Sequence, residues 1–261
     1  MNLDKLTVNI KPLSAYQAID LGIAMARAWY VPLWKIWCKH AVFVLILALV
    51  LAFFIADQEE TWWVAAVLFW WLKPIYEKPM LIYLSRKLFD EHYNRNQVAM
   101  DAKKMPSVFY FLIWRLGFLR IIAMSVRLLE GQTAKNATTR INVLTRKQNS
   151  AISLYVLLFF VGEMVTLFAC WQLFHEWFLD NTLFSDWLFS VDADGRWLSA
   201  FWVLCYGMIS SIFAPFYVAS GFSVYLCKRS LLEGWDIELM FYKLRHRYLA
   251  LKDGSNRGMH Q

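Results

Sequence analysis

The chain has 261 residues, of which 59% are hydrophobic and 18% charged, and its formal net charge is +7. Soluble domains are about 45–50% apolar and about 25% charged, so the composition argues against a soluble domain and predicts an integral membrane protein. Residues 1–12 hold no apolar core of the kind that a secretory signal peptide has. We therefore expect insertion without cleavage.

The first part of the chain predicts an in-plane helix followed by two membrane crossings. Residues 13–36 mix apolar and polar side chains, which is typical of a helix in the membrane interface. A hydrocarbon core about 30 Å thick needs about 20 mostly apolar helical residues. We place the first two spans at residues 37–56 and 61–76, with an acidic turn between them.

The middle of the chain holds an apolar segment, residues 107–129, that is interrupted by Arg115 and Arg120. An arginine at the centre of a membrane helix costs about 2.5–3.5 kcal/mol on insertion scales. We therefore predict an interfacial or re-entrant segment whose arginines reach the lipid phosphates. A true crossing is the alternative.

The last part of the chain predicts two further spans, at residues 150–174 and 197–226. Apolar side chains at helical spacing predict an amphipathic helix at residues 235–250, and residues 253–261 are expected to form a disordered tail. The predicted fold is all-α. It is a single membrane domain, residues 1–261, with four transmembrane helices and in-plane amphipathic helices.

The basic residues set the predicted orientation. With the N-terminus inside, every Lys and Arg except Arg196 falls on or beside the cytoplasmic segments. Cytoplasmic loops are rich in these residues, so we expect a bacterial inner-membrane protein with both termini in the cytoplasm. The positive charge suits the anionic lipids of the inner leaflet. We expect no nucleic-acid partner, because the charges are spread over three segments without a binding motif.

Two prolines suggest an internal repeat. Lys73-Pro74-Ile75-Tyr76 and Ala214-Pro215-Phe216-Tyr217 stand at matching places in the two predicted hairpins, and each is followed by a basic cluster. Both hairpins start inside, so the repeat would be parallel. Coincidence in an aromatic-rich chain is the alternative.

Glu163 is the sharpest candidate for a functional residue, because it lies in the middle of a predicted span. An intramembrane carboxylate is costly and suggests a function by default. We expect it to be protonated or paired with Arg115 or Arg120. A purely structural carboxyl group, hydrogen-bonded between helices near Ser210 or Ser211, is the alternative.

The sequence Leu-Leu-Glu-Gly occurs at residues 128–131 and again at residues 231–234. Because glycine accepts backbone angles that other residues avoid, we interpret both copies as joints at the ends of helices. We expect Glu130 or Glu233 to form an ion pair with a nearby basic residue, Arg86 or Arg229.

The sequence holds no catalytic constellation. The pair His175-Glu176 lacks the second histidine of a zinc-protease motif, and no phosphate-binding or dinucleotide motif is present. We therefore predict no enzyme activity, no bound metal and no cofactor.

Four blocks carry a family resemblance: Ala18-Ile19-Asp20-Leu21-Gly22, Trp70-Trp71-Leu72-Lys73-Pro74, Leu129-Glu130-Gly131 and Leu232-Glu233-Gly234-Trp235-Asp236. With these blocks the chain resembles uncharacterised polytopic inner-membrane proteins of Gram-negative bacteria. That family is distantly similar to the membrane domain of glycerophosphodiester phosphodiesterases, without their catalytic domain. The resemblance implies a membrane-protein partner and no known activity.

The sequence leads to two hypotheses about function. The first is a non-enzymatic scaffold or accessory component of an inner-membrane complex, which contacts membrane lipids and a protein partner and leaves oligomerisation open. The alternative is a lipid-handling protein or transporter with a midplane site around Glu163.

Overall fold

The structure is a computed structural model that describes residues 13–55, 61–88, 93, 97–104, 119–132, 134–145, 149–179 and 196–234. Every regular element within these ranges is helical, so the predicted all-α class is confirmed. The amphipathic helix predicted at residues 235–250, the tail at 253–261 and Arg115 lie outside the described residues.

The first half of the described chain contributes five helices: α1 (Ala15–Ala28), α2 (Tyr30–Ile55), α3 (Thr61–Trp71), α4 (Lys73–Lys87) and α5 (Val98–Lys104). Helix α1 begins at a capping box, in which the Ser14 side chain accepts a hydrogen bond from the Gln17 backbone N–H and the Gln17 side chain accepts one from the Ser14 backbone N–H. It ends at Trp29, and α2 starts at the next residue. The first apolar helix therefore begins earlier than the predicted residue 37.

The second half contributes α7 (Arg120–Leu129), α8 (Ala134–Thr145), α9 (Asn149–Phe174) and α11 (Arg196–Glu233), with a π-helical turn at His175–Leu179. Within the described ranges, three stretches are long and apolar enough to cross a membrane: Tyr30–Phe54, Ser150–Trp177 and Ala200–Glu233. The stretch predicted as a span at residues 61–76 is divided between α3 and α4. The break falls at Leu72, and Pro74 occupies the first turn of α4.

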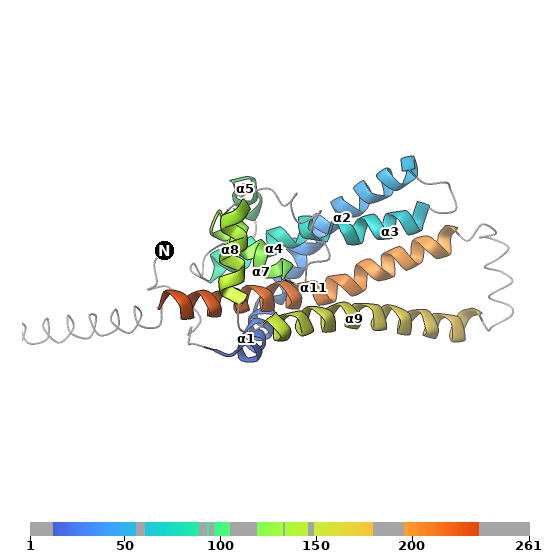
Figure 1. The fold of residues 1–261 in the computed structure, drawn as a ribbon. Helices are drawn as coiled ribbons and strands as arrows, with labels where there is room; N and C mark the ends of the chain where they lie inside the picture. Colours follow the sequence, from blue (N-terminus) through green and yellow to red (C-terminus); the bar gives the residue numbers. More distant parts are fainter. Residues whose placement is uncertain are drawn as a thin grey trace, which may run out of the picture.

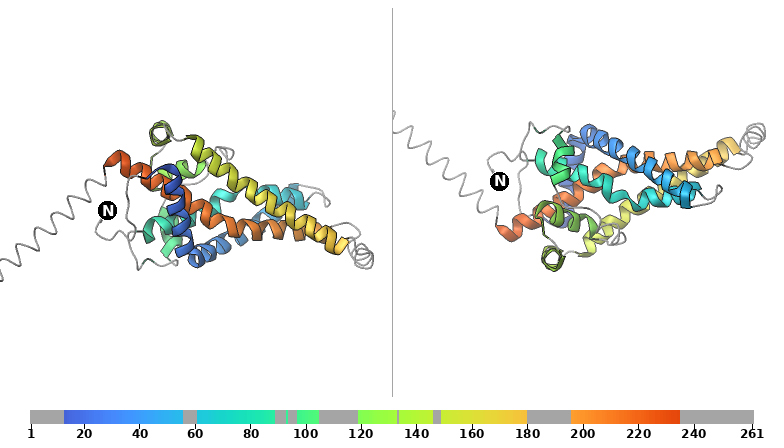
Figure 2. Two further views of the ribbon diagram at one scale, coloured as in Figure 1. Left: turned by 90° about the horizontal axis from the view of Figure 1, so that it is seen from below. Right: turned by 90° about the horizontal axis from the view of Figure 1, so that it is seen from above.

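Helix α11 is the central element of the bundle. It runs along the whole molecule and packs against α1, α2, α3, α4, α7, α8 and α9 (Figure 1). Helix α1 crosses it (Figure 2), and this crossing needs glycine. A Cβ atom on Gly22 would lie 2.2 Å from Cα of Ser220. The two backbones therefore touch, and the Ser220 hydroxyl donates a hydrogen bond to the Ile19 carbonyl at 3.3 Å.

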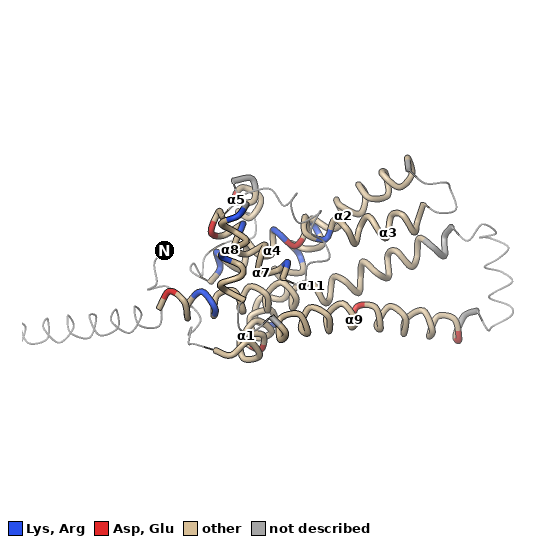
Figure 3. Tube along the Cα trace, in the orientation of Figure 1, with Lys and Arg blue, Asp and Glu red and all other residues tan. Residues whose placement is uncertain are grey.

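Charge is distributed unevenly along the bundle. Lys and Arg gather toward the end that carries α5 and α8 (Figure 3). Helix α3 has no charged residue, and Glu163 is the one charged residue of α9. The half of the bundle that carries almost no charge is thus built from the second half of α2, α3, α9 and the first half of α11.

Helix α7 is the described part of the segment predicted at residues 107–129, whose interfacial or re-entrant position stays a prediction. Its residues Ile121, Met124 and Val126 are buried, and it packs on α11. Arg120 does not reach out toward lipid phosphates, because its side chain is 3% exposed and pairs with a carboxylate inside the bundle.

Candidate functional site

Two buried ion pairs lie inside the helical bundle. Lys73 Nζ on α4 lies 2.5 Å from Glu163 Oε1 on α9, and these side chains are 7% and 4% exposed. Arg120 Nη1 on α7 lies 2.6 Å from Glu77 Oε2 on α4, with side chains 3% and 0% exposed. Each buried carboxylate is therefore neutralised by one buried cation, as isolated charges in an apolar interior would require.

The two ion pairs lie close together, because each includes a residue of α4 and each cation lies near Tyr217 of α11. Lys73 and Glu77 are four residues apart on α4, so they lie on one face of that helix. Tyr217 of α11 lies between the pairs: its ring centroid is 5.9 Å from Lys73 Nζ and 5.6 Å from Arg120 Cζ. Arg120 Nη2 also donates a hydrogen bond to the Tyr217 hydroxyl at 3.3 Å. We call Lys73, Glu77, Arg120, Glu163 and Tyr217 the buried charge cluster.

Tyr155 of α9 packs against the ring of Tyr217. The rings of Tyr155 and Tyr217 are stacked, with centroids 6.3 Å apart and an angle of 2° between their planes. The Tyr155 hydroxyl donates to the Phe216 carbonyl of α11 at 3.2 Å. The cluster thus joins α4, α7, α9 and α11 through polar contacts in an otherwise apolar bundle.

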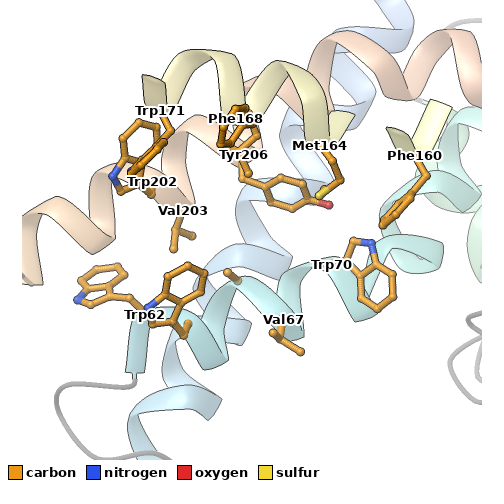
Figure 4. A pocket seen from close by; sticks show the side chains of 13 residues that line it. Trp62, Val67, Trp70, Phe160, Met164, Phe168, Trp171, Trp202, Val203 and Tyr206 are labelled. Atoms are coloured by element: carbon orange, nitrogen blue, oxygen red, sulfur yellow. The ribbon is translucent and has the colours of Figure 1, made fainter. Parts of the chain in front are cut away.

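An apolar cleft of about 680 Å³ lies beside the cluster, between α3 and α9 (Figure 4). Its floor comes from α11, where Val203 and Tyr206 are buried. Five side chains of α3 form one wall: Trp62, Trp63, Ala66, Val67 and Trp70.

Helix α9 forms the opposite wall with Phe160, Met164, Leu167, Phe168 and Trp171, and Trp202 of α11 completes the lining. No charged side chain of the described residues lines the cleft. The rims are open, because Trp63 is 73% and Phe168 62% exposed in the isolated chain. The cleft is therefore an open apolar groove on the part of the bundle that carries almost no charge.

The two ends of the cleft differ. Figure 4 shows Trp62 and Trp202 toward one end, and Trp70 and Phe160 toward the other. The second end leads to the buried charge cluster, because Lys73 follows Trp70 by three residues and Glu163 lies between Phe160 and Leu167 on the helical face that lines the cleft. We call the tryptophan-rich end the outer end and the end near Glu163 the inner end.

The structure pairs Glu163 differently from the sequence prediction. Arg120 was one of two expected partners, but it bonds to Glu77, and Arg115 lies outside the described residues. The actual partner is Lys73. Sequence reasoning missed Lys73 because it placed this residue at the inner end of a span. The sequence did hold a signal that could have indicated Lys73 as a partner. Lys73 is a cation that directly follows an uncharged tryptophan-rich stretch and stands four residues before Glu77.

The two Leu-Leu-Glu-Gly copies both end a helix on a glycine with positive φ, 65° at Gly131 and 64° at Gly234. Glu130 Oε2 accepts from Arg140 Nε at 3.0 Å, and Glu233 Oε2 accepts from Arg229 Nε at 2.9 Å. Arg140 also bonds to Glu233, which links the two joints.

Further contacts complete this group at the charged end of the bundle. Glu130 Oε1 accepts from the Tyr225 hydroxyl at 2.9 Å and lies 3.9 Å from Arg229 Nε. Burial opposes the charge on Arg140, but hydrogen bonds and charges from Glu130 and then Glu233 raise the pKa of Arg140 overall. We call Glu130, Arg140, Arg229, Glu233 and Tyr225 the joint cluster.

Arg86 does not belong to the joint cluster. Its Nε atom lies 3.6 Å from Asp101 Oδ2, on α5. The same carboxylate accepts a hydrogen bond from the Tyr93 hydroxyl at 2.8 Å. Burial and this hydrogen bond raise the pKa of Tyr93. Among the described residues, no group of three His, Cys, Asp or Glu side chains could hold a metal ion.

Comparison of the chain with models of known families, with curated proteins and with solved structures finds no match. The resemblance to an inner-membrane family stays a prediction. Functional inference rests on the cleft and the two clusters.

Proposed function

We propose that the protein is a non-enzymatic inner-membrane protein that handles lipids, and that it holds one hydrocarbon chain of a membrane lipid in the cleft between α3 and α9. This is the alternative among the two hypotheses drawn from the sequence. The observation that carries it is the cleft itself. Its volume of about 680 Å³ falls within the range of about 300–1,000 Å³ that is usual for small-molecule sites.

The chemistry of the lining favours a hydrocarbon chain. The walls are aromatic and aliphatic, and none of the lining residues that the structure describes is charged. A polar or ionic ligand would lose its hydration in such a groove without gaining a partner, whereas an apolar chain would lose nothing. The neighbouring charges of Lys73 and Glu163 neutralise each other, so they offer little attraction to an ionic headgroup at the inner end.

The location of the cleft supports the same occupant. Its floor and one wall come from α11 and α9, both long and apolar enough to cross a membrane. In a bilayer the open side of the groove would face lipid, so the acyl chains of neighbouring lipids would be the most abundant ligands available to it. The scaffold hypothesis stays a prediction for which the described residues offer no specific observation.

The proposal includes the topology. Helices α2, α9 and α11 would cross the membrane, and α3 with the start of α4 would form the fourth crossing despite the break at Leu72. The basic end of the bundle with α5 and α8 would face the cytoplasm. The outer end of the cleft would then lie at the periplasmic interface, where tryptophan side chains are favoured.

Native mass spectrometry of the purified protein tests the proposal. Protein released from mild detergent is expected to carry one co-purified phospholipid or other acyl lipid. Ala66→Phe would fill the cleft from the α3 wall and should abolish that adduct. Leu204→Phe on α11 is the matched control, because Leu204 is exposed and does not line the cleft. Equal lipid retention by both variants would count against a lipid in the cleft.

A further inference from the structure

We propose that the cleft selects hydrocarbon chains by length, and that the Lys73–Glu163 ion pair is the stop that sets the limit. This inference rests on the proposed function. It goes further by assigning a specificity-determining role to two residues that do not line the cleft.

The length of the cleft is the first argument. From Trp62 to Trp70 an α-helix rises about 12 Å, and from Phe160 to Trp171 about 16 Å. The hydrocarbon core of a bilayer is about 30 Å thick, so one leaflet contributes about 15 Å. The groove therefore matches the length of a single leaflet, which is the depth that one acyl chain fills.

The second argument is the construction of the inner end. Helices α3 and α9 both pack along α11, and the cleft is the space between them. The contact between Lys73 Nζ and Glu163 Oε1 bridges this space from α4 to α9 beside Trp70, Phe160 and Met164, which line the inner end. A chain that continued past this point would have to separate the two charges in an apolar interior, which is strongly unfavourable.

The third argument is what lies behind the bridge. Glu77, Arg120 and Tyr217 occupy the space beyond Lys73, and the Glu77–Arg120 pair is buried as well. A methylene group placed there would displace hydrogen bonds without replacing them. The apolar groove thus ends at a polar wall. The tail of the lipid would point to this wall, and its headgroup would lie at the outer end near Trp62 and Trp202.

Affinity measured against chain length tests the proposal. The purified protein in detergent is titrated with a series of lysophospholipids that share one headgroup and differ only in chain length, each brominated at the end of its chain to quench tryptophan fluorescence. Affinity, referred to the lysophospholipid that is free in water, is expected to rise by up to about fourfold for each added methylene and then to stop rising at one length. A constant increase over the whole series would overturn the proposal.

Variants locate the stop. Lys73→Leu/Glu163→Leu replaces the bridge with apolar side chains and should move the plateau to longer chains. Lys73→Arg keeps a cation opposite Glu163 and should leave the plateau in place. An unchanged plateau in the double variant would show that the ion pair is not the stop.

A second variant keeps the test decisive if the double variant does not fold. Met164→Trp fills the inner end in front of the bridge and should move the plateau to shorter chains. The same plateau as in the wild type would overturn the inference. Absence of binding for every chain length in the wild type would instead contradict the proposed function.

Discussion

Lys73 and Glu163 are 90 residues apart in the sequence, yet their side chains meet at 2.5 Å inside the bundle. Helix α9 exposes most of its apolar residues, and this contact ties it to α4. The pair therefore has a structural effect whatever the cleft binds, because it fixes the spacing of two helices that both rest on α11. Stability and lipid binding can be measured separately.

Lys73→Met should destabilise the protein strongly, because it leaves the buried carboxylate of Glu163 without a cation. Breaking a buried ion pair in this way costs about 3–5 kcal/mol. The double variant Lys73→Met/Glu163→Met removes both charges and should recover most of that loss. Thermal unfolding in one detergent measures both. A double variant as unstable as the single one would show that the charges are needed beyond their mutual compensation.

Gly22→Ala should weaken the crossing of α1 over α11. The added methyl group would lie 2.2 Å from Cα of Ser220, and that backbone atom cannot move aside cheaply. Overpacking of this kind costs about 1–3 kcal/mol. Gly207→Ala on α11 is the matched control, because a Cβ atom there meets nothing within 4 Å. It should be neutral or stabilising by up to about 1 kcal/mol. Similar losses in both variants would contradict the close approach.

The helices that the sequence predicted well are those whose boundaries follow from hydropathy. The span predicted at residues 150–174 corresponds closely to α9, Asn149–Phe174. Helix α11 begins one residue before the predicted span but continues to Glu233, beyond the predicted end at residue 226. Hydropathy could not show this extension, because the last turns of α11 are held by polar contacts with α7 and α8 rather than by an apolar environment.

The candidate site was less predictable, since it depends on contacts between distant segments. Hydropathy and charge marked Glu163 as a carboxylate that is costly to bury in a membrane span. Whether its partner is Lys73, Arg115 or Arg120 depends on which helices pack together, and a single sequence does not show which helices are neighbours. The cleft was missed for a related reason. Nothing in the spacing of the tryptophans shows that two walls leave a groove between them.

Glu130 should matter more than Glu233 within the joint cluster. The Glu130 side chain is 9% exposed and accepts hydrogen bonds from Arg140 and Tyr225, whereas the Glu233 side chain is 30% exposed. We expect Glu130→Gln to cost about 1–3 kcal/mol and Glu233→Gln less than about 1 kcal/mol. Chemical denaturation and hydrogen exchange in α8 measure the difference. Equal effects would show that burial does not rank the two carboxylates.

Charge reversal separates the basic partners of Glu233. Glu233→Arg places three arginines together and should increase hydrogen exchange at the end of α11. Adding Arg229→Glu to the Glu233→Arg variant should reverse much of this effect, because Arg229 Nε lies 2.9 Å from Glu233 Oε2 in the wild type. Adding Arg86→Glu instead should not reverse it, because Arg86 lies beside Asp101. Rescue by Arg86→Glu alone would contradict the arrangement of the joint cluster.

The four-crossing topology predicts the side of the membrane on which each loop lies. Reporter fusions after Asp57 and near Asp186 should score as periplasmic, and fusions near Lys103 and after Lys252 as cytoplasmic. Lys103 is the decisive position, because it belongs to α5, at the basic end of the bundle. If α3 and the start of α4 cross the membrane together, this end must lie opposite the outer end of the cleft. A periplasmic signal at Lys103 would contradict the fourth crossing, and with it the placement of the outer end of the cleft at the periplasmic interface.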